Sequence, residues 1–197
     1  MFQAMQQSTL AVPRLSLRAA VLIGLAIIAT LAWAHFWMGR SPICKCGTVK
    51  PWHGGLGDAE MSQHLADWYT FGHVLRGFVL YWLLSIASRG HLSVGARLVI
   101  ATLVEGALEL VENTPFIVDR MRARAIYSGD SIVNSIGDML AMVAGFLLAA
   151  RLPAWVTVLL LVATEAALLW LIRDNLTLGA IMLIYPVDAI KQWQLAG

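Results

Sequence analysis

Charged residues are scarce in this chain of 197 residues. Aspartate, glutamate, lysine and arginine together make up 13% of it, whereas about 25% is usual for a soluble domain. Hydrophobic residues make up 59%, and the mean hydropathy is +0.71. Such a chain cannot cover itself with polar surface, and its long uncharged runs indicate that the apolar excess faces lipid.

Other absences exclude further classes of protein. Two cysteines, Cys44 and Cys46, cannot make the disulfide framework of a small secreted domain. The basic residues are scattered and the net charge is only +2, so no clustered basic face exists for nucleic acid. No small-residue cleavage site follows the first apolar run, 17–38, and we expect that run to stay in the mature protein as a membrane anchor.

Long apolar segments predict an all-α polytopic transmembrane bundle, with the whole chain as a single membrane domain. A spanning helix needs about 20 apolar residues. Segment 94–112 contains Glu105 and Glu109, but we include it because the alternative leaves its many aliphatic side chains in water. A short hydrophobic segment, 176–190, is either a tilted sixth span or an interfacial segment, because Pro186 interrupts it. The five predicted spans are 17–38, 71–88, 94–112, 130–152 and 153–172.

Consecutive spans alternate in direction, and this predicts on which side of the membrane the polar residues lie. The two long connections, 39–70 and 114–129, are expected on the same side of the membrane, together with the start of the second span and the end of the third. Arg14 and Arg18 lie next to the start of the first span and favour an N-terminus on the cytoplasmic side.

Acidic residues recur at helical spacing near that side. Glu105, Glu109 and Glu112 form one stripe, and Asp130, Asn134 and Asp138 a second. Ionisable groups at membrane depth should face the bundle interior and are functional candidates. We predict that His73, Glu109 and Asp138 meet in one polar pocket. The candidate catalytic residues are His73, Glu109, Asp130 and Asp138.

A structural role for these residues is the alternative. His73 and Arg76 could pair with the carboxylates and simply hold the helices together. The acidic groups outnumber these two partners, however, and surplus carboxylates must be protonated, hydrated or bound to a cation. A divalent metal is therefore a candidate cofactor.

The first long connection carries a second candidate metal site. Its potential ligands are Cys44, Cys46, His53 and His64. The Cys-x-Cys spacing departs from the Cys-x2–4-Cys spacing typical of zinc sites. A disulfide between residues two apart would be strained, so we expect the two thiols to be unbonded and close to His53 or His64.

Five segments together resemble a known family. They are RSPICKCGTVK at 40–50, SQHLADWY at 62–69, EN at 112–113, GDSIVNS at 129–135 and RDNLTL at 173–178. The chain resembles an uncharacterised family of multi-pass inner-membrane proteins, found mostly in alphaproteobacteria. The resemblance implies a location in the bacterial inner membrane but no activity. A weaker likeness, to the VanZ-like membrane proteins, rests on the order of Asp67 and His73, then Glu105 and Glu109, then Asp130 and Asp138.

Three functions are compatible with this pattern. The first is a metal-dependent or acid–base membrane enzyme acting on a lipid-linked substrate. The second is a non-catalytic subunit or chaperone of a larger complex, and the third is a small ion-coupled transporter. Transport predicts polar residues across the full depth of the membrane, whereas here they become sparse beyond Glu105. Membrane lipid is the expected partner, nucleic acid is not, and the pattern identifies no protein partner.

Overall fold

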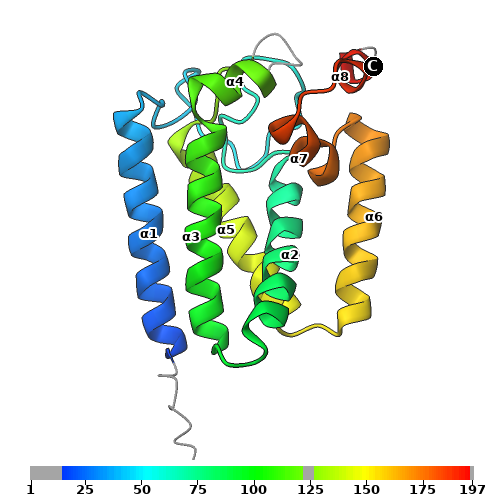
Figure 1. Ribbon diagram of the computed structural model, residues 1–197. Helices are drawn as coiled ribbons and strands as arrows, with labels where there is room; N and C mark the ends of the chain where they lie inside the picture. The colour runs from blue at the N-terminus through cyan, green and yellow to red at the C-terminus, as the bar shows by residue number, and fades with distance from the viewer. Residues whose placement is uncertain (1–14, 122–126, 196–197) are drawn as a thin grey trace, which may run out of the picture.

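The computed structural model describes residues 15–121 and 127–195, and in this part of the chain every regular element is a helix (Figure 1). The long helices lie side by side, and the two long connections meet at one end of the bundle, as predicted. The helices are α1 (Leu17–Trp37), α2 (Thr70–Ser88), α3 (Val94–Glu112), α4 (Pro115–Met121), α5 (Ile132–Ala149), α6 (Ala154–Ile172), α7 (Leu176–Ile184) and α8 (Asp188–Leu195).

Four of these helices, α1, α2, α5 and α6, are long and apolar enough to cross a membrane. Helix α3 has the same length as α2 but carries four charged residues, and it runs beside the others within the bundle. The segment 176–190 is not one span. It forms the separate helices α7 and α8, and the nine residues of α7 reach only about 13 Å at 1.5 Å per residue. Helix α4 occupies part of the predicted connection 114–129, of which residues 122–126 lie outside the described part of the chain.

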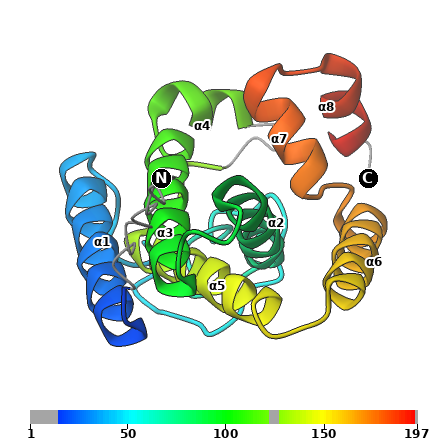
Figure 2. The same ribbon diagram turned by 60° about the horizontal axis from the view of Figure 1, so that its bottom comes forward.

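Helices α2 and α5 cross at the centre of the bundle, with α3, α6 and α7 around α2 (Figure 2). Glycines make this crossing close. A Cβ atom on Gly77 would lie 2.2 Å from the Met142 carbonyl oxygen, and one on Gly145 would lie 2.1 Å from the Val74 carbonyl oxygen. Small residues let helix backbones approach in this way.

The start of α5 corrects one predicted stripe. Ser131 is the N-cap of α5, and its hydroxyl accepts a hydrogen bond from the Asn134 backbone N–H at 3.2 Å. Capping by a serine hydroxyl at this position is favourable, and it leaves Asp130 in the connection before the helix. Asp130 therefore does not share a helical face with Asp138.

The first long connection is fixed to α5 by hydrogen bonds. Its Ser41 and Pro42 carbonyls accept from the backbone N–H groups of Ile132 and Val133, at 2.9 and 3.1 Å. The Asn134 side chain donates to the His64 carbonyl at 2.9 Å. These bonds satisfy backbone groups of both partners and hold the connection over the end of the bundle.

Candidate functional site

His73 of α2 is surrounded by carboxylates from α3 and α5. Its Nδ1 lies 2.6 Å from Glu105 Oε1 and 3.5 Å from Glu109 Oε1, and its Nε2 lies 3.6 Å from Asp138 Oδ2. All four side chains are buried. The predicted convergence of His73, Glu109 and Asp138 is confirmed, while their role stays a prediction.

The position of each side chain follows from helix geometry. Glu105 and Glu109 are four residues apart and so lie on one face of α3, and the crossing at Gly77 brings α5, with Asp138, close to α2. Thr70, in the first turn of α2, donates its hydroxyl to Asp138 Oδ1 at 2.8 Å. The same hydroxyl oxygen accepts from the Asp67 backbone N–H at 3.0 Å.

Arg76 balances only part of the negative charge. It donates to Glu105 at 3.2 Å and to Glu112 at 3.1 Å. Glu109 has only 1% of its surface exposed, and neither of its oxygens has a hydrogen-bond partner among the described residues. A buried polar atom without a partner is costly and calls for an explanation.

His73, Glu109 and Asp138 could hold a metal ion. Each offers one ligand atom, and these three atoms lie within 4.8 Å of one another. His73 Nδ1 lies at hydrogen-bond distance from Glu105 Oε1, 2.6 Å, where a ring N–H would donate to the carboxylate. Metal-binding histidines are commonly oriented by a carboxylate in this way.

Asp130, the fourth candidate, lies outside this group. Its carboxylate accepts from the Asn113 side chain at 2.6 Å and from the Tyr127 hydroxyl at 2.9 Å. Burial raises the pKa of Tyr127, and the neighbouring Asp130 carboxylate adds to the effect. Asp130 thereby ties the end of α3 to the start of α5 at the same end of the bundle. Asn113 and Thr70 were not among the predicted site residues, because uncharged polar residues near helix ends are common and carry no distinctive signal.

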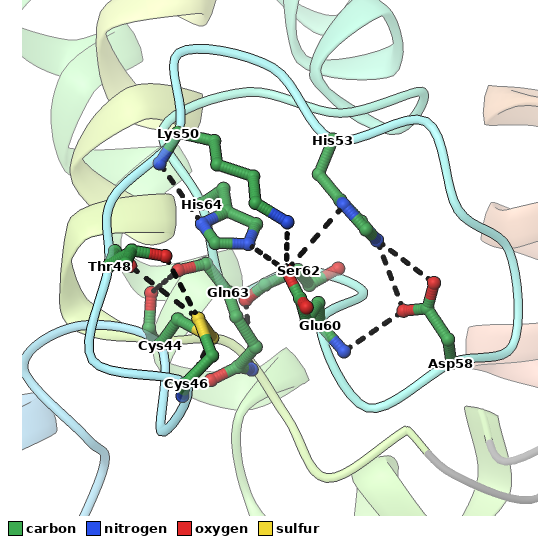
Figure 3. The surroundings of a disulfide bond; sticks show 11 residues. Cys44, Cys46, Thr48, Lys50, His53, Asp58, Glu60, Ser62, Gln63 and His64 are labelled. Carbon is green, nitrogen blue, oxygen red and sulfur yellow. Dashed lines mark hydrogen bonds and ion pairs between the residues drawn. A yellow bond between two sulfur atoms is a disulfide. The ribbon is translucent and has the colours of Figure 1, made fainter.

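Cys44 and Cys46 form a disulfide, and the prediction that they are unbonded is wrong (Figure 3). A turn makes the pairing feasible. The Gly47 N–H donates to the Cys44 carbonyl at 3.0 Å with a φ of +80° at Gly47, and the two Cα atoms lie 5.1 Å apart. That separation is within the usual range for disulfides, about 4.4–6.8 Å.

The predicted proximity of the cysteines to His64 is confirmed. Ligand atoms of Cys44, Cys46, Glu60 and His64 lie within 4.8 Å of one another, whereas His53 is not in this group. His64 Nδ1 accepts from the Lys50 N–H at 3.2 Å and Nε2 lies 2.8 Å from Glu60, so both ring nitrogens are engaged. Metal ligation needs thiolates, so the metal prediction for this loop applies only to a reduced and rearranged form.

Glu60 is the residue of this loop that the sequence did not single out. It pairs with Lys50 and His64, and its Oε2 lies 3.9 Å from His53 Nδ1 (Figure 3). Hydrogen bonds from Lys50 and His64 lower the pKa of Glu60 to about 2. A lone glutamate in a long polar connection has no spacing signal, and only the folded loop shows its partners.

Known proteins match this chain over most of its length. Residues 35–196 match the family model described as "Protein of unknown function (DUF2585)". A UPF0314 protein of Paracoccus denitrificans is 52% identical over 178 residues, which is 87% of this chain and 90% of the relative. One from Sphingopyxis alaskensis is 48% identical over 184 residues, 91% and 97% of the two chains. No solved structure matches, and none of these matches supports the likeness to VanZ-like proteins.

Proposed function

Because this chain belongs to the DUF2585 family of proteins of unknown function, we propose its function from the buried cluster itself. The protein is a multi-pass protein of the bacterial inner membrane that binds a divalent cation through His73, Glu109 and Asp138. It uses this site for metal-dependent or acid–base chemistry on a lipid-linked substrate. The observation that carries the proposal is the meeting of three buried metal-ligand side chains, one of which, Glu109, has oxygens that lack hydrogen bonds among the described residues.

The distribution of side chains on α3 supports a fifth span. This helix buries Glu105 and Glu109 and exposes Leu103 and Val111, 53% and 47% of their surfaces. A helix of a soluble protein would place the carboxylates outside and the aliphatic groups inside. The reverse pattern suits a helix whose outer face meets lipid and whose polar groups face the bundle interior.

Exposed tryptophans support the membrane boundaries. Trp33 and Trp37 lie at the end of α1 near the two long connections, and Trp170 lies near the same end of α6. Trp155 begins α6 at the opposite end. Tryptophan is enriched where hydrocarbon meets headgroups, so these residues outline two interfaces with the cluster close to one of them.

Charge supports cation binding over a purely structural cluster. Four carboxylates, those of Glu105, Glu109, Glu112 and Asp138, face one guanidinium and one imidazole. A divalent cation would offset the surplus and supply partners for Glu109. Once bound, it would polarise a phosphoryl or carbonyl oxygen or activate water. The nearby long connections suit a substrate that enters at headgroup level.

The test is metal analysis of the detergent-solubilised protein after incubation with Mg²⁺, Mn²⁺, Ca²⁺ or Zn²⁺ and removal of free ions. We expect about one tightly held equivalent of one of these metals in the wild-type protein, as one three-ligand site implies. Glu109→Gln and Asp138→Asn should lose it while remaining folded, because an amide keeps shape but not charge. Glu105→Gln should weaken the affinity by about 10–100-fold, as for other residues that orient a metal ligand.

The matched control is Glu165→Gln in α6. Glu165 binds the backbone N–H groups at the start of α7 and lies outside the cluster. This variant should retain the metal. Wild-type protein that holds no metal, or equal loss in the Glu165 variant, would contradict the proposal. A Glu109→Gln variant with a higher free energy of unfolding and an unchanged metal content would also contradict the proposal. That result is expected if the substitution only removes repulsion between like charges.

A further inference from the structure

We propose that the Cys44–Cys46 disulfide is a thiol–disulfide exchange site that accepts two electrons from an exposed dithiol of a partner molecule. This inference is independent of the buried cluster. It rests on the unequal exposure of the two cysteines, on a backbone N–H that donates to Cys44 Sγ whereas Cys46 Sγ contacts the side-chain hydroxyl and the carbonyl of Thr48, and on the separate anchoring of the loop that carries them.

The two cysteines differ in ways that assign their roles. Cys46 is exposed, whereas Cys44 has only 3% of its surface exposed. The Cys46 backbone N–H donates to Cys44 Sγ at 3.1 Å. An N–H donor favours the thiolate form of the sulfur that it contacts. Cys46 is therefore the sulfur open to attack, and Cys44 is the sulfur prepared to leave.

Two polar side chains, those of His64 and Glu60, lie beside the disulfide. Ligand atoms of His64 and Glu60 lie within 4.8 Å of the sulfurs (Figure 3). Glu60 and Nε2 of His64 share one hydrogen bond at 2.8 Å. Because Glu60 is ionised, with a pKa of about 2, and His64 Nδ1 accepts from the Lys50 N–H, the released Cys44 thiolate takes up its proton from solvent.

The disulfide is poorly placed to serve as a structural staple. It joins residues two apart in the sequence, and closing so short a loop constrains the unfolded chain less than closing a long one. The connection is held instead by bonds on either side, from Ile132 to Ser41, from Leu65 to Lys50 and from His53 to Ala66. Removing the disulfide should leave these bonds intact.

The reaction balances without any further reagent. A thiolate of the partner dithiol attacks Cys46 Sγ, the S–S bond breaks, and its electron pair leaves on Cys44 as a thiolate that takes up a proton. The second partner thiolate then attacks its own sulfur in the mixed disulfide and releases Cys46. The partner ends as a disulfide, and this chain ends with two thiols, having gained two electrons and two protons.

The first experiment maps the attacked sulfur in native wild-type protein. The detergent-solubilised protein is treated with reduced glutathione, quenched in acid and alkylated with N-ethylmaleimide, and its peptides are identified by mass. We expect glutathione on Cys46 and the alkyl group on Cys44, in at least about tenfold excess over the reverse, because attack follows access to the sulfur. An adduct mainly on Cys44, or no reaction until the protein is unfolded, would overturn the proposal.

The second experiment separates exchange from a structural role. The double variant Cys44→Ser, Cys46→Ser should melt within a few degrees of wild type. It should also lose all oxidation of a dithiol peptide that the wild-type protein oxidises stoichiometrically. A double variant that fails to fold or melts far below wild type would show that the disulfide is a staple, and the proposal would fail. The glutathione mapping does not depend on this variant.

Discussion

At the scale of single residues, Glu60 makes the stability of the first long connection depend on pH. It accepts from Lys50 and His64 and lies near His53, so three basic side chains of the loop meet at one carboxylate. The hydrogen bonds from Lys50 and His64, above all that of Lys50, hold the pKa of Glu60 at about 2, against an ordinary value of 4.5. The loop therefore depends on an ionised Glu60.

This dependence predicts a loss of stability in acid. A carboxyl group with a lowered pKa in the folded state stabilises the fold above its unfolded pKa and loses that effect as the pH falls through its folded pKa. The contribution of Glu60 should be complete above about pH 4.5 and vanish by about pH 2. Melting temperatures of wild type and Glu60→Gln measure it. Wild type should melt higher at pH 7, and the difference should shrink below pH 4.5, whereas a difference constant from pH 7 to pH 3 would contradict the assignment.

At the scale of elements, the crossing of α2 and α5 positions the candidate site. His73 lies one turn before Gly77 in α2, and Asp138 lies two turns before Gly145 in α5. Because these glycines set how closely the two backbones approach, they also set the separation of His73 Nε2 from Asp138.

Gly77→Ala tests this relation. Its Cβ would lie 2.2 Å from the Met142 carbonyl oxygen and 2.6 Å from the Phe146 nitrogen, both backbone atoms that cannot rotate away. We expect the free energy of unfolding in detergent to fall by about 1–3 kcal/mol, the usual cost of overpacking. Metal affinity at the cluster should fall with it.

Gly72→Ala is the matched control in the same helix. No atom lies within 4 Å of a Cβ at that position, and alanine favours the helix by up to about 1 kcal/mol over glycine. This variant should be as stable as wild type or more so. Equal destabilisation by the two substitutions would show that the crossing does not limit the helix approach.

At the scale of the whole molecule, the disulfide bears on the orientation that the proposed membrane protein would have. Disulfides persist in oxidising compartments and are rare in the cytosol. The loop with Cys44 and Cys46 lies at the same end as the cluster and as the second long connection (Figure 1). This end is therefore expected on the periplasmic side. Arg14 and Arg18 favour a cytoplasmic N-terminus, and the two expectations agree. Arg14 lies outside the described residues.

Reporter fusions check the orientation. Alkaline phosphatase joined after Thr48 or after Tyr127 should be active, and joined after His91 it should be inactive, because this enzyme needs an oxidising compartment for its own disulfides. A fluorescent reporter that works only in the cytosol should give the opposite pattern. Opposite sides for Thr48 and Tyr127 would contradict the arrangement of the bundle, and activity only after His91 would reverse its orientation.

Apolar run length and periodicity were enough to predict the helical class and most helix bounds. The predicted segments 17–38, 71–88, 94–112 and 153–172 each agree with a helix of the structure to within one residue at either end. This was feasible because hydrocarbon requires long helices, and long apolar runs are visible in a single chain. The stripe of Glu105 and Glu109 and the common side of the two long connections follow from periodicity and alternation, and they placed three of the four candidate residues in one cluster.

Tertiary structure decided what depends on contacts between distant segments. Asp130 lies outside the cluster because Ser131 caps α5 and Asp130 precedes the helix. Residues 176–190 contribute to two short helices, α7 and α8, and do not form one span. Glu60 and Thr70 acquired partners that no spacing encodes, and the turn at Gly47 allowed the disulfide that sequence separation argued against. Periodicity specifies which face of a helix a residue occupies. The neighbour that this face meets depends on how the helices cross, and only the folded chain defines that.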